Sequence, residues 1–203
     1  ISVCMATYNG EKYIEQQIQS ILVQLSDKDE LIISDDNSTD NTVKIIKGIS
    51  DSRIKLFFNK EKGYTSNFEN ALNQVTGDII FLSDQDDIWI FNKVEICLKE
   101  LESYDFVVSD CKVINNKNEI ISESYFGLRN VKKTGLGNLI KFSFLGCCIA
   151  FRADVLKKAL PFPSNRKLCT HDNWHFLVGA FLFKYKVLDD KLIHYRRHNN
   201  NVS

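Results

Sequence analysis

The chain has 203 residues, with 26 basic and 26 acidic side chains and a formal net charge of zero. This balance provides no overall field that would attract nucleic acid or an acidic membrane. A polyanion-binding role is therefore disfavoured, apart from a local basic pair at Arg196 and Arg197. The length allows one domain of good size or two small ones, and we expect a single domain.

The six cysteines show neither a CxxC pair nor the spacing of a zinc finger. Cys4 and Cys97 lie in apolar strand and helix patterns, so we interpret the cysteines as small buried hydrophobic residues of a reducing compartment. No apolar run reaches the roughly 18 residues needed to span a bilayer, and no signal sequence opens the chain. These features predict a soluble, cytoplasmic protein. Because the chain starts inside an apolar strand, we expect it to be part of a longer protein.

Short apolar runs alternate with helical periodicity in the first half of the chain. Five runs are expected to be strands buried on both faces: 1–6, 31–33, 54–58, 79–82 and 106–108. Apolar residues recur with helical spacing between them, in the segments 14–25, 42–49, 68–75 and 94–101. This alternation predicts an α/β fold with a mostly parallel central sheet and helices on both faces. Ligands of such sheets bind at the carboxyl ends of the strands.

The pattern changes after Ser109. Segments 112–114 and 119–121 predict a hairpin around four polar residues, and an irregular stretch follows to about Gly137, which we expect to be functional or mobile. The remaining elements are predicted as a strand at 144–151, a helix at 153–160, a break at Pro161-Phe162-Pro163, and a helix that carries Trp174, Leu177, Val178 and Phe181.

The segment IIFLSDQDD at 79–87 is an apolar run that ends in three acids, Asp84, Asp86 and Asp87. Like charges crowded at a strand end repel one another and lose hydration, and a divalent cation with oxygen preference relieves both effects. The alternative is a solvated acidic turn that caps the following helix. These residues alone leave both interpretations open.

Two further strand ends carry polar residues, Thr7-Tyr8-Asn9 after the first strand and Asp35-Asp36-Asn37 after the second. In a parallel sheet they meet the acids at one edge. A nucleotide fits this set, because Tyr8 can stack on a base, Asp36 can accept hydrogen bonds from it, and a metal at Asp86 can bridge phosphates.

Structural alternatives stand beside these roles. Asp35 and Asp36 can cap a helix together with Ser38, Thr39 and Asp40, and we expect at least one of these acids to do only that. Tyr8 can be an ordinary tyrosine at the rim of the core.

Two nucleotide-binding motifs are missing from the sequence. Neither a GxGxxG turn nor a GxxxxGK[ST] loop occurs, which argues against dinucleotide oxidoreductases and P-loop enzymes. The residues after the acid cluster also give only weak support to an aspartyl-phosphate nucleophile.

Four segments together resemble glycosyltransferase family 2: SVCMATYN at 2–9, ELIISDDNSTD at 30–40, GDIIFLSDQDD at 77–87 and HDNW at 171–174. The DQDD form, the HD pair and the later YRRH at 195–198 are similar to the rhamnosyltransferase-like branch. The resemblance covers nearly the whole chain. It implies a single GT-A domain over 1–203, in which 1–110 binds the nucleotide sugar and 111–203 binds the acceptor.

The resemblance also implies roles for residues on the donor side. Tyr8 and Asp36 would contact the base, with Thr7 and Asn9 shaping the pocket and Asp35 nearby. Asp84 and Asp86 match the DxD element, in which the second acid contacts Mg²⁺ or Mn²⁺ and the first lies near the ribose or sugar; Asp87 is a third acid. The remaining donor-side matches are Gly63, Asn67, Arg196 and His198, the last two in a terminal segment that closes over metal and diphosphate.

The implied reaction is an inverting transfer to an acceptor hydroxyl, with Asp172 as the base and a nucleoside diphosphate as the leaving group. Without the resemblance, Asp172 is better explained as a cap of the helix that carries Trp174. Gly146, Cys147 and Trp174 match the acceptor side, although Cys148 replaces a residue that is often Thr in other members.

Donor and acceptor are implied only by class. The donor would be a UDP- or dTDP-linked sugar, and the acceptor a glycan or lipid-linked glycan, which would place the enzyme at the inner face of the membrane. A sugar nucleotidyltransferase, a phosphohydrolase and a non-catalytic sugar-nucleotide-binding module are the alternatives.

Overall fold

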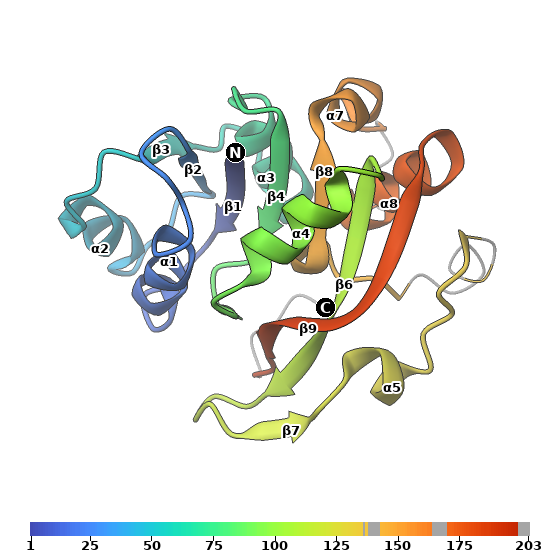
Figure 1. Cartoon of the computed structure of the whole chain (residues 1–203). Coiled ribbons are helices and arrows are strands. Elements are labelled where there is room, and N and C mark those ends of the chain that lie inside the picture. Colours follow the sequence, from blue (N-terminus) through green and yellow to red (C-terminus); the bar gives the residue numbers. More distant parts are fainter. Residues whose placement is uncertain (136, 138–142, 164–169, 199–203) are drawn as a thin grey trace.

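The computed structural model describes residues 1–135, 137, 143–163 and 170–198 (Figure 1). Its first four long strands are β1 (Ser2–Thr7), β2 (Glu30–Asp35), β3 (Ile54–Phe58) and β4 (Ile79–Ser83). They pair in parallel in the order β3-β2-β1-β4. Helices α1 (Ile14–Leu22), α2 (Thr42–Gly48) and α3 (Tyr64–Leu72) connect them. The predicted strand and helix alternation is confirmed for this half.

The sheet continues from β4 with strands of mixed direction. Next in order are β8 (Ile149–Arg152), β6 (Phe106–Ile114), β9 (Tyr185–Arg196) and β5 (Ile88–Trp89), while β7 (Ile120–Ser122) pairs with β6. β8 is antiparallel to both β4 and β6, whereas β9 is parallel to β6. Because β8 is antiparallel to β4, it begins at the edge of the sheet where β4 ends.

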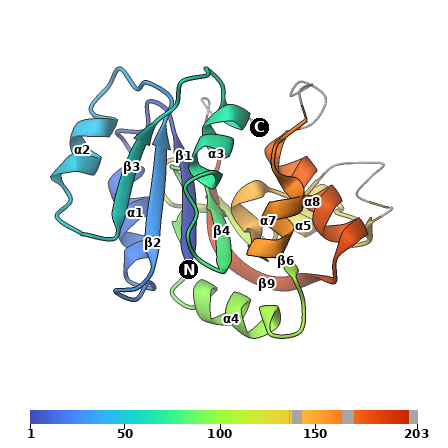
Figure 2. The same ribbon diagram turned by 90° about the horizontal axis from the view of Figure 1, so that it is seen from above.

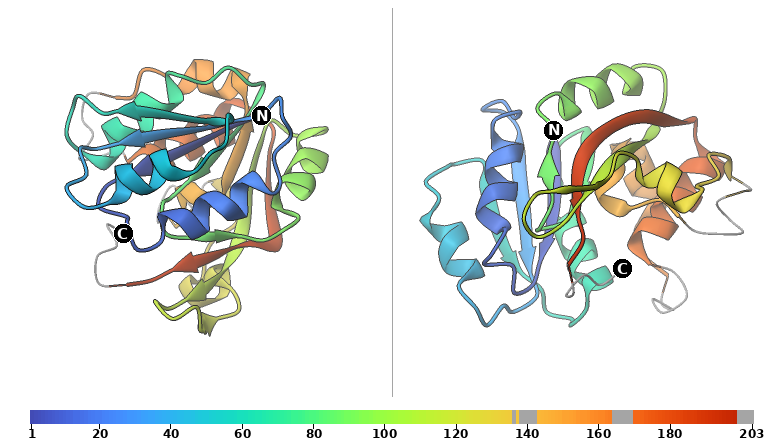
Figure 3. Two further views of the ribbon diagram at one scale, coloured as in Figure 1. Left: turned by 90° about the vertical axis from the view of Figure 1, so that its left-hand side faces the viewer. Right: turned by 90° about the horizontal axis from the view of Figure 1, so that it is seen from below.

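Helices cover both faces of the sheet, as predicted. α1, α2 and α4 (Lys93–Leu101) lie over one face, and α3, α7 (Ala153–Ala159) and α8 (His171–Leu182) lie over the other (Figures 1 and 3). α3 packs over β1 and β2, and it contacts α8 (Figure 2). The apolar side chains of the strands are buried between these layers in one continuous core cluster.

Several elements of the second half differ from the prediction. The expected strand at 144–151 is a 3-10 turn, η1 (Gly146–Cys148), followed by the shorter strand β8, because the chain turns at the sheet edge before it pairs with β4. The expected strand at 106–108 and the first hairpin arm are one long strand, β6. The irregular stretch contains the short helix α5 (Tyr125–Arg129).

Two expectations about the whole chain are also addressed by the structure. The five cysteines in the described ranges are buried and free, and Cys169 lies outside those ranges. No helix in the described part of the chain combines the length and apolar character needed to cross a membrane.

Candidate functional site

Asp35, the last residue of β2, accepts hydrogen bonds from the protein on both carboxylate oxygens. It is buried, and its carboxylate accepts hydrogen bonds from the Thr7 hydroxyl (2.9 Å), the Ser38 backbone N–H (2.8 Å) and the Ser38 hydroxyl (2.6 Å). Asp40 likewise accepts from the backbone N–H of Thr42 at the start of α2. Asp35 thus holds the turn after β2, whereas Asp40 contacts the first residue of α2.

The second acid, Asp36, also has donors on both oxygens. Asn59 Nδ2 donates to Oδ1 (2.8 Å), and the Gly63 backbone N–H donates to Oδ2 (3.0 Å). Gly63 has a φ of 128°, a conformation that residues with a side chain rarely adopt. Asp36 thus holds the loop that leads into α3, and no sequence pattern pointed to its partner Asn59.

The end of β1 is tied to the acid segment by one glutamine. Gln85 accepts from the Tyr8 backbone N–H (2.9 Å) and donates to the Tyr8 carbonyl (3.0 Å). Tyr8 is 47% exposed. Asn9 takes a left-handed conformation and binds the loop after β2, whereas buried Asn67 donates to the Thr7 carbonyl (3.0 Å). Sequence analysis missed Gln85 because its role depends on a contact 77 positions away.

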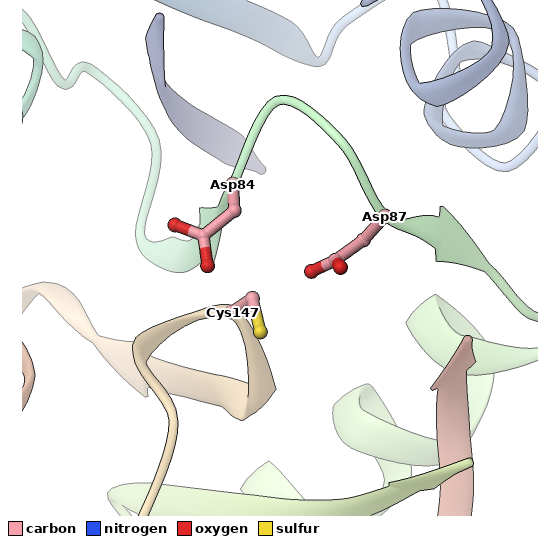
Figure 4. Close-up of side chains that lie close together, drawn as sticks. All are labelled: Asp84, Asp87 and Cys147. Atoms are coloured by element: carbon pink, nitrogen blue, oxygen red, sulfur yellow. The ribbon is translucent and has the colours of Figure 1, made fainter. Parts of the chain in front are cut away.

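Two acids of the acid loop, which we define as residues 84–87, face a thiol. One ligand atom each from Asp84, Asp87 and Cys147 lies within 4.8 Å of the others (Figure 4). Asp87 is fully buried; its Oδ1 accepts from the Arg196 backbone N–H (2.9 Å), and its Oδ2 has no hydrogen-bond partner among the described residues. An unpaired buried carboxylate oxygen is costly, so the donor set fits a divalent cation.

The pKa values of the acid loop also favour a bound cation. Burial, with the nearby charges of Asp86 and Asp172, raises the pKa of Asp84 to about 7. Burial together with Asp86 and Asp84 raises the pKa of Asp87 well above its usual value. Negative charge is thus crowded without enough compensation, which is the condition that a bound cation relieves.

Asp86 and His198 form a separate pair beside this cluster. His198 Nε2 lies 2.7 Å from Asp86 Oδ2, and its ring stacks on Tyr13 with the centroids 5.3 Å apart. Of the expected metal set, Asp84 lies with Asp87 and Cys147, and Asp86 pairs with His198; a metal shared by the three expected residues stays a prediction.

Arg196 is buried and holds the acid loop in place. Its Nε donates to the Asp86 carbonyl (2.6 Å), Nη2 donates to Gln16 Oε1 (3.2 Å), and the guanidinium lies 4.4 Å from the centroid of the Tyr13 ring. It also donates to the Asn115 carbonyl. These contacts assign Arg196 to the support of the loop, which differs from the expected contact with a diphosphate.

Asp172 lies in the first turn of α8, next to η1. The Thr170 hydroxyl and the Asn173 backbone N–H both donate to its Oδ1, the latter at 2.9 Å. A Cβ on Gly146 would come within 3.3 Å of Asp172 Cβ and 2.7 Å of His171 Nε2, so η1 and α8 approach closely only because this residue is glycine. Because Cys147, the residue after Gly146, faces Asp84 and Asp87, η1 lies between Asp172 and the acid loop.

The aromatic residues near Asp172 are used in packing. Trp174 donates its indole N–H to the Ala159 carbonyl (2.7 Å), and the ring of His171 stacks on Phe68 at 3.9 Å between centroids. Burial lowers the pKa of His171 below the usual value of histidine. Trp174 thus joins α8 to α7.

A buried lysine that sequence analysis missed supports η1. Lys93, at the start of α4, donates from Nζ to the Cys147 carbonyl (2.7 Å) and lies 4.4 Å from the centroid of the Trp89 ring. The helical pattern had placed the neighbouring Val94 and Cys97 inward but gave no signal for a charged residue there. Lys93 fixes the backbone that carries the Cys147 thiol.

Curated relatives of this chain are bacterial glycosyltransferases. It is 33% identical to the Escherichia coli UDP-Glc:alpha-D-GlcNAc-diphosphoundecaprenol beta-1,3-glucosyltransferase, over 82% of this chain and 65% of that protein. It is 31% identical to the Shigella flexneri dTDP-rhamnosyl transferase, over 97% of this chain and 72% of that protein. An uncharacterized Nostoc glycosyltransferase is 26% identical over the whole chain and 67% of its own length. The chain thus spans about two thirds of the length of these relatives.

Solved structures show the same fold. S. aureus TarS in complex with UDP-GlcNAc matches with a TM-score of 0.78 and 21% identity, over 98% of this chain and 59% of that one. The Pyrobaculum calidifontis mannosyltransferase in complex with GDP-Man and Mn²⁺ matches with a TM-score of 0.74 and 20% identity, over 98% and 57% of the two chains. These neighbours confirm the GT-A-like α/β fold. Because the model of the family "Glycosyl transferase family 2" matches residues 2–160, the chain belongs to that family.

Proposed function

We propose that this protein is an inverting, metal-dependent glycosyltransferase. It would move a sugar from a nucleoside diphosphate to a hydroxyl of a glycan or lipid-linked acceptor in cell-surface polysaccharide synthesis. The observation that carries this proposal is the position of Asp172 beside η1, the turn whose Cys147 faces Asp84 and Asp87, because it supports a base near the acids that we propose to bind a cation.

The donor side would be formed by residues 1–110. Exposed Tyr8 is available to stack on the base, and Asp36 lies at the neighbouring strand end, linked to β1 by a hydrogen bond from its N–H to the Thr7 carbonyl (2.9 Å). Thr7, Asn9, Asp35 and Asn67 would shape this pocket through the contacts described above. The Asp36 contact with the base stays a prediction, because both of its oxygens already accept hydrogen bonds.

The acid loop would hold Mg²⁺ or Mn²⁺. A cation bound by Asp84, with Asp87 or Asp86 and His198, would neutralise the charge that develops on the leaving diphosphate. The protein's own part is to keep these carboxylates together, which Arg196 does through the Asp86 carbonyl and the Asp87 side chain.

Asp172 would take the proton from the attacking hydroxyl. Both of its hydrogen bonds within the described part of the chain end on Oδ1, which leaves Oδ2 for the acceptor. Such a positioned base contributes typically ~10² to 10⁴-fold to the rate. The acceptor would bind to the half formed by 111–203, and the acceptor contacts of Gly146, Cys147 and Trp174 stay predictions.

The named relatives support this choice of substrates. One acts on a diphosphoundecaprenol-linked sugar with UDP-Glc, and another uses a dTDP-linked donor. We therefore propose a UDP- or dTDP-linked donor and a lipid-linked acceptor, with the enzyme in the cytoplasm at the inner face of the membrane.

A thermal-shift screen of nucleoside diphosphates with and without Mn²⁺ tests the donor class, since stabilisation follows affinity. One nucleotide is expected to raise the melting temperature only with Mn²⁺, and Asp86→Ala is expected to weaken this effect.

Analysis of the reaction products then separates sugar transfer from the alternative functions. Nucleoside diphosphate supports transfer, whereas pyrophosphate or inorganic phosphate would indicate a nucleotidyltransferase or a phosphohydrolase. Donor binding without acceptor-dependent release would indicate a binding module.

A further inference from the structure

The Cys147 side chain faces the acid loop. Its sulfur and one carboxylate oxygen each of Asp84 and Asp87 lie within 4.8 Å of one another, and Figure 4 shows both carboxylates extending toward the sulfur. The acids follow β4, and the thiol comes from η1 before the antiparallel neighbour β8. Three potential ligand atoms from two segments therefore surround one position.

The unpaired oxygen of Asp87 is a second observation that points to a cation at this position. The residue is fully buried, and its Oδ2 has no hydrogen-bond partner in the described part of the chain. Within those same ranges, neither Asp84 nor Asp87 forms an ion pair with a basic side chain. A buried carboxylate that lacks both a hydrogen-bond donor on one oxygen and a basic partner favours a bound cation.

The thiol is held in place by its backbone. Lys93 Nζ donates to the Cys147 carbonyl, and Gly146 lets η1 pack against His171. The ammonium group of Lys93 is therefore used on the carbonyl and over the Trp89 ring, so it fixes the turn without pairing with the acids. Ligands positioned before the ion arrives bind it with less loss of conformational entropy.

We propose that Cys147 is a thiolate ligand of this site and that, with Asp84 and Asp87, it binds a thiophilic divalent cation of the Zn²⁺ and Cd²⁺ type. Thiolates select such ions, whereas Mg²⁺ prefers oxygen. Binding forms a metal–sulfur bond and releases the thiol proton to water. The inference rests on the cation role proposed for the acid loop, and it makes Zn²⁺ a competitor of the ion that supports transfer.

Cadmium titration of the full-length protein, followed by the sulfur-to-cadmium charge-transfer absorbance in the ultraviolet, tests the proposal. Wild-type protein is expected to develop this band with one equivalent of Cd²⁺. Cys147→Ser is expected to lose the band and to bind Cd²⁺ roughly tenfold or more weakly, a loss on the scale that even outer-shell changes produce. Cys97→Ser, which alters a buried thiol on α4, is the matched control and is expected to keep the band. Cys148→Ser alters the neighbouring thiol, which is hydrogen-bonded to Cys147, and is expected to weaken the band without removing it.

A band that persists in Cys147→Ser, or that disappears only in Cys148→Ser, would overturn the assignment. If Cys147→Ser does not fold, ¹¹³Cd NMR of the wild-type protein replaces it: a resonance of mixed sulfur and oxygen ligation supports the proposal, and an all-oxygen resonance or none contradicts it. Mg²⁺-dependent binding of nucleotide, measured on the same samples, distinguishes failure of the Cys147 assignment from failure of the proposed function. Intact Mg²⁺-dependent binding without a cadmium–sulfur signal rejects only Cys147, whereas loss of both rejects the proposed function as well.

Discussion

Two groups of aspartates occupy neighbouring strand ends but differ in how their charges are compensated. After β2, Asp35 and Asp36 accept hydrogen bonds from hydroxyl, amide and backbone donors on both oxygens. After β4, Asp84 and Asp87 face each other and a thiol, and one oxygen of Asp87 has no partner among the described residues. The same residue type therefore stabilises the loop at one strand end and, at the other, forms a crowded group of carboxylates that fits a cation.

This comparison predicts which substitutions affect chemistry and which affect folding. The largest effect is expected for Asp172→Asn, because the amide cannot take the acceptor's proton. Turnover should fall by ~10² to 10⁴-fold while nucleotide binding stays unchanged. Steady-state kinetics and calorimetry with the nucleoside diphosphate measure the two quantities. Wild-type turnover in this variant would remove Asp172 as the base.

Asp35→Ala is expected to destabilise the fold. It leaves the Thr7 hydroxyl and the Ser38 backbone N–H without their acceptor, a loss of about 1–3 kcal/mol for buried groups. Urea denaturation in the presence of a chelator measures this loss. Asp84→Ala is the matched control and should cause no comparable loss without metal. Equal losses in both variants would mean that the two groups of aspartates do not differ in how the protein compensates their charges.

The pH dependence of stability should reveal the crowded acids. Because the pKa of folded Asp84 is raised to about 7, the folded state holds more protons than the unfolded state between about pH 4 and pH 7. Stability of the metal-free protein should therefore decline as pH rises through this window. Melting curves between pH 5 and 8 should show a smaller decline for Asp84→Asn and for wild type with Mn²⁺. The same slope in all three samples would argue against uncompensated charge at Asp84.

The smallest effect is expected at the exposed end of β1. Tyr8→Ala should raise KM for the donor by up to about tenfold, because an aromatic contact contributes roughly 0.5–1.5 kcal/mol. Tyr8→Phe keeps the ring and should behave like wild type in initial-rate measurements. A large loss of kcat in Tyr8→Phe would instead indicate a role for the hydroxyl.

The parallel half of the fold was predictable because its strands are uninterrupted apolar runs. β9 was missed, since it mixes charged and apolar residues such as Asp189, Asp190 and Lys191 and pairs with β6, about 80 positions earlier. The three strand-end clusters were identified correctly as polar, but their contacts were not. The acid loop meets Cys147 and Asp172 only because β8 is antiparallel to β4, a direction that local sequence does not encode.

Anomalous diffraction from a crystal grown with Mn²⁺ and a nucleoside diphosphate tests the central claim most directly. The account predicts a manganese peak within coordination distance of the acid loop carboxylates, next to the diphosphate, and none at Asp35 or Asp36. A nucleotide bound without manganese at the acid loop, or a peak at the end of β2, would contradict it.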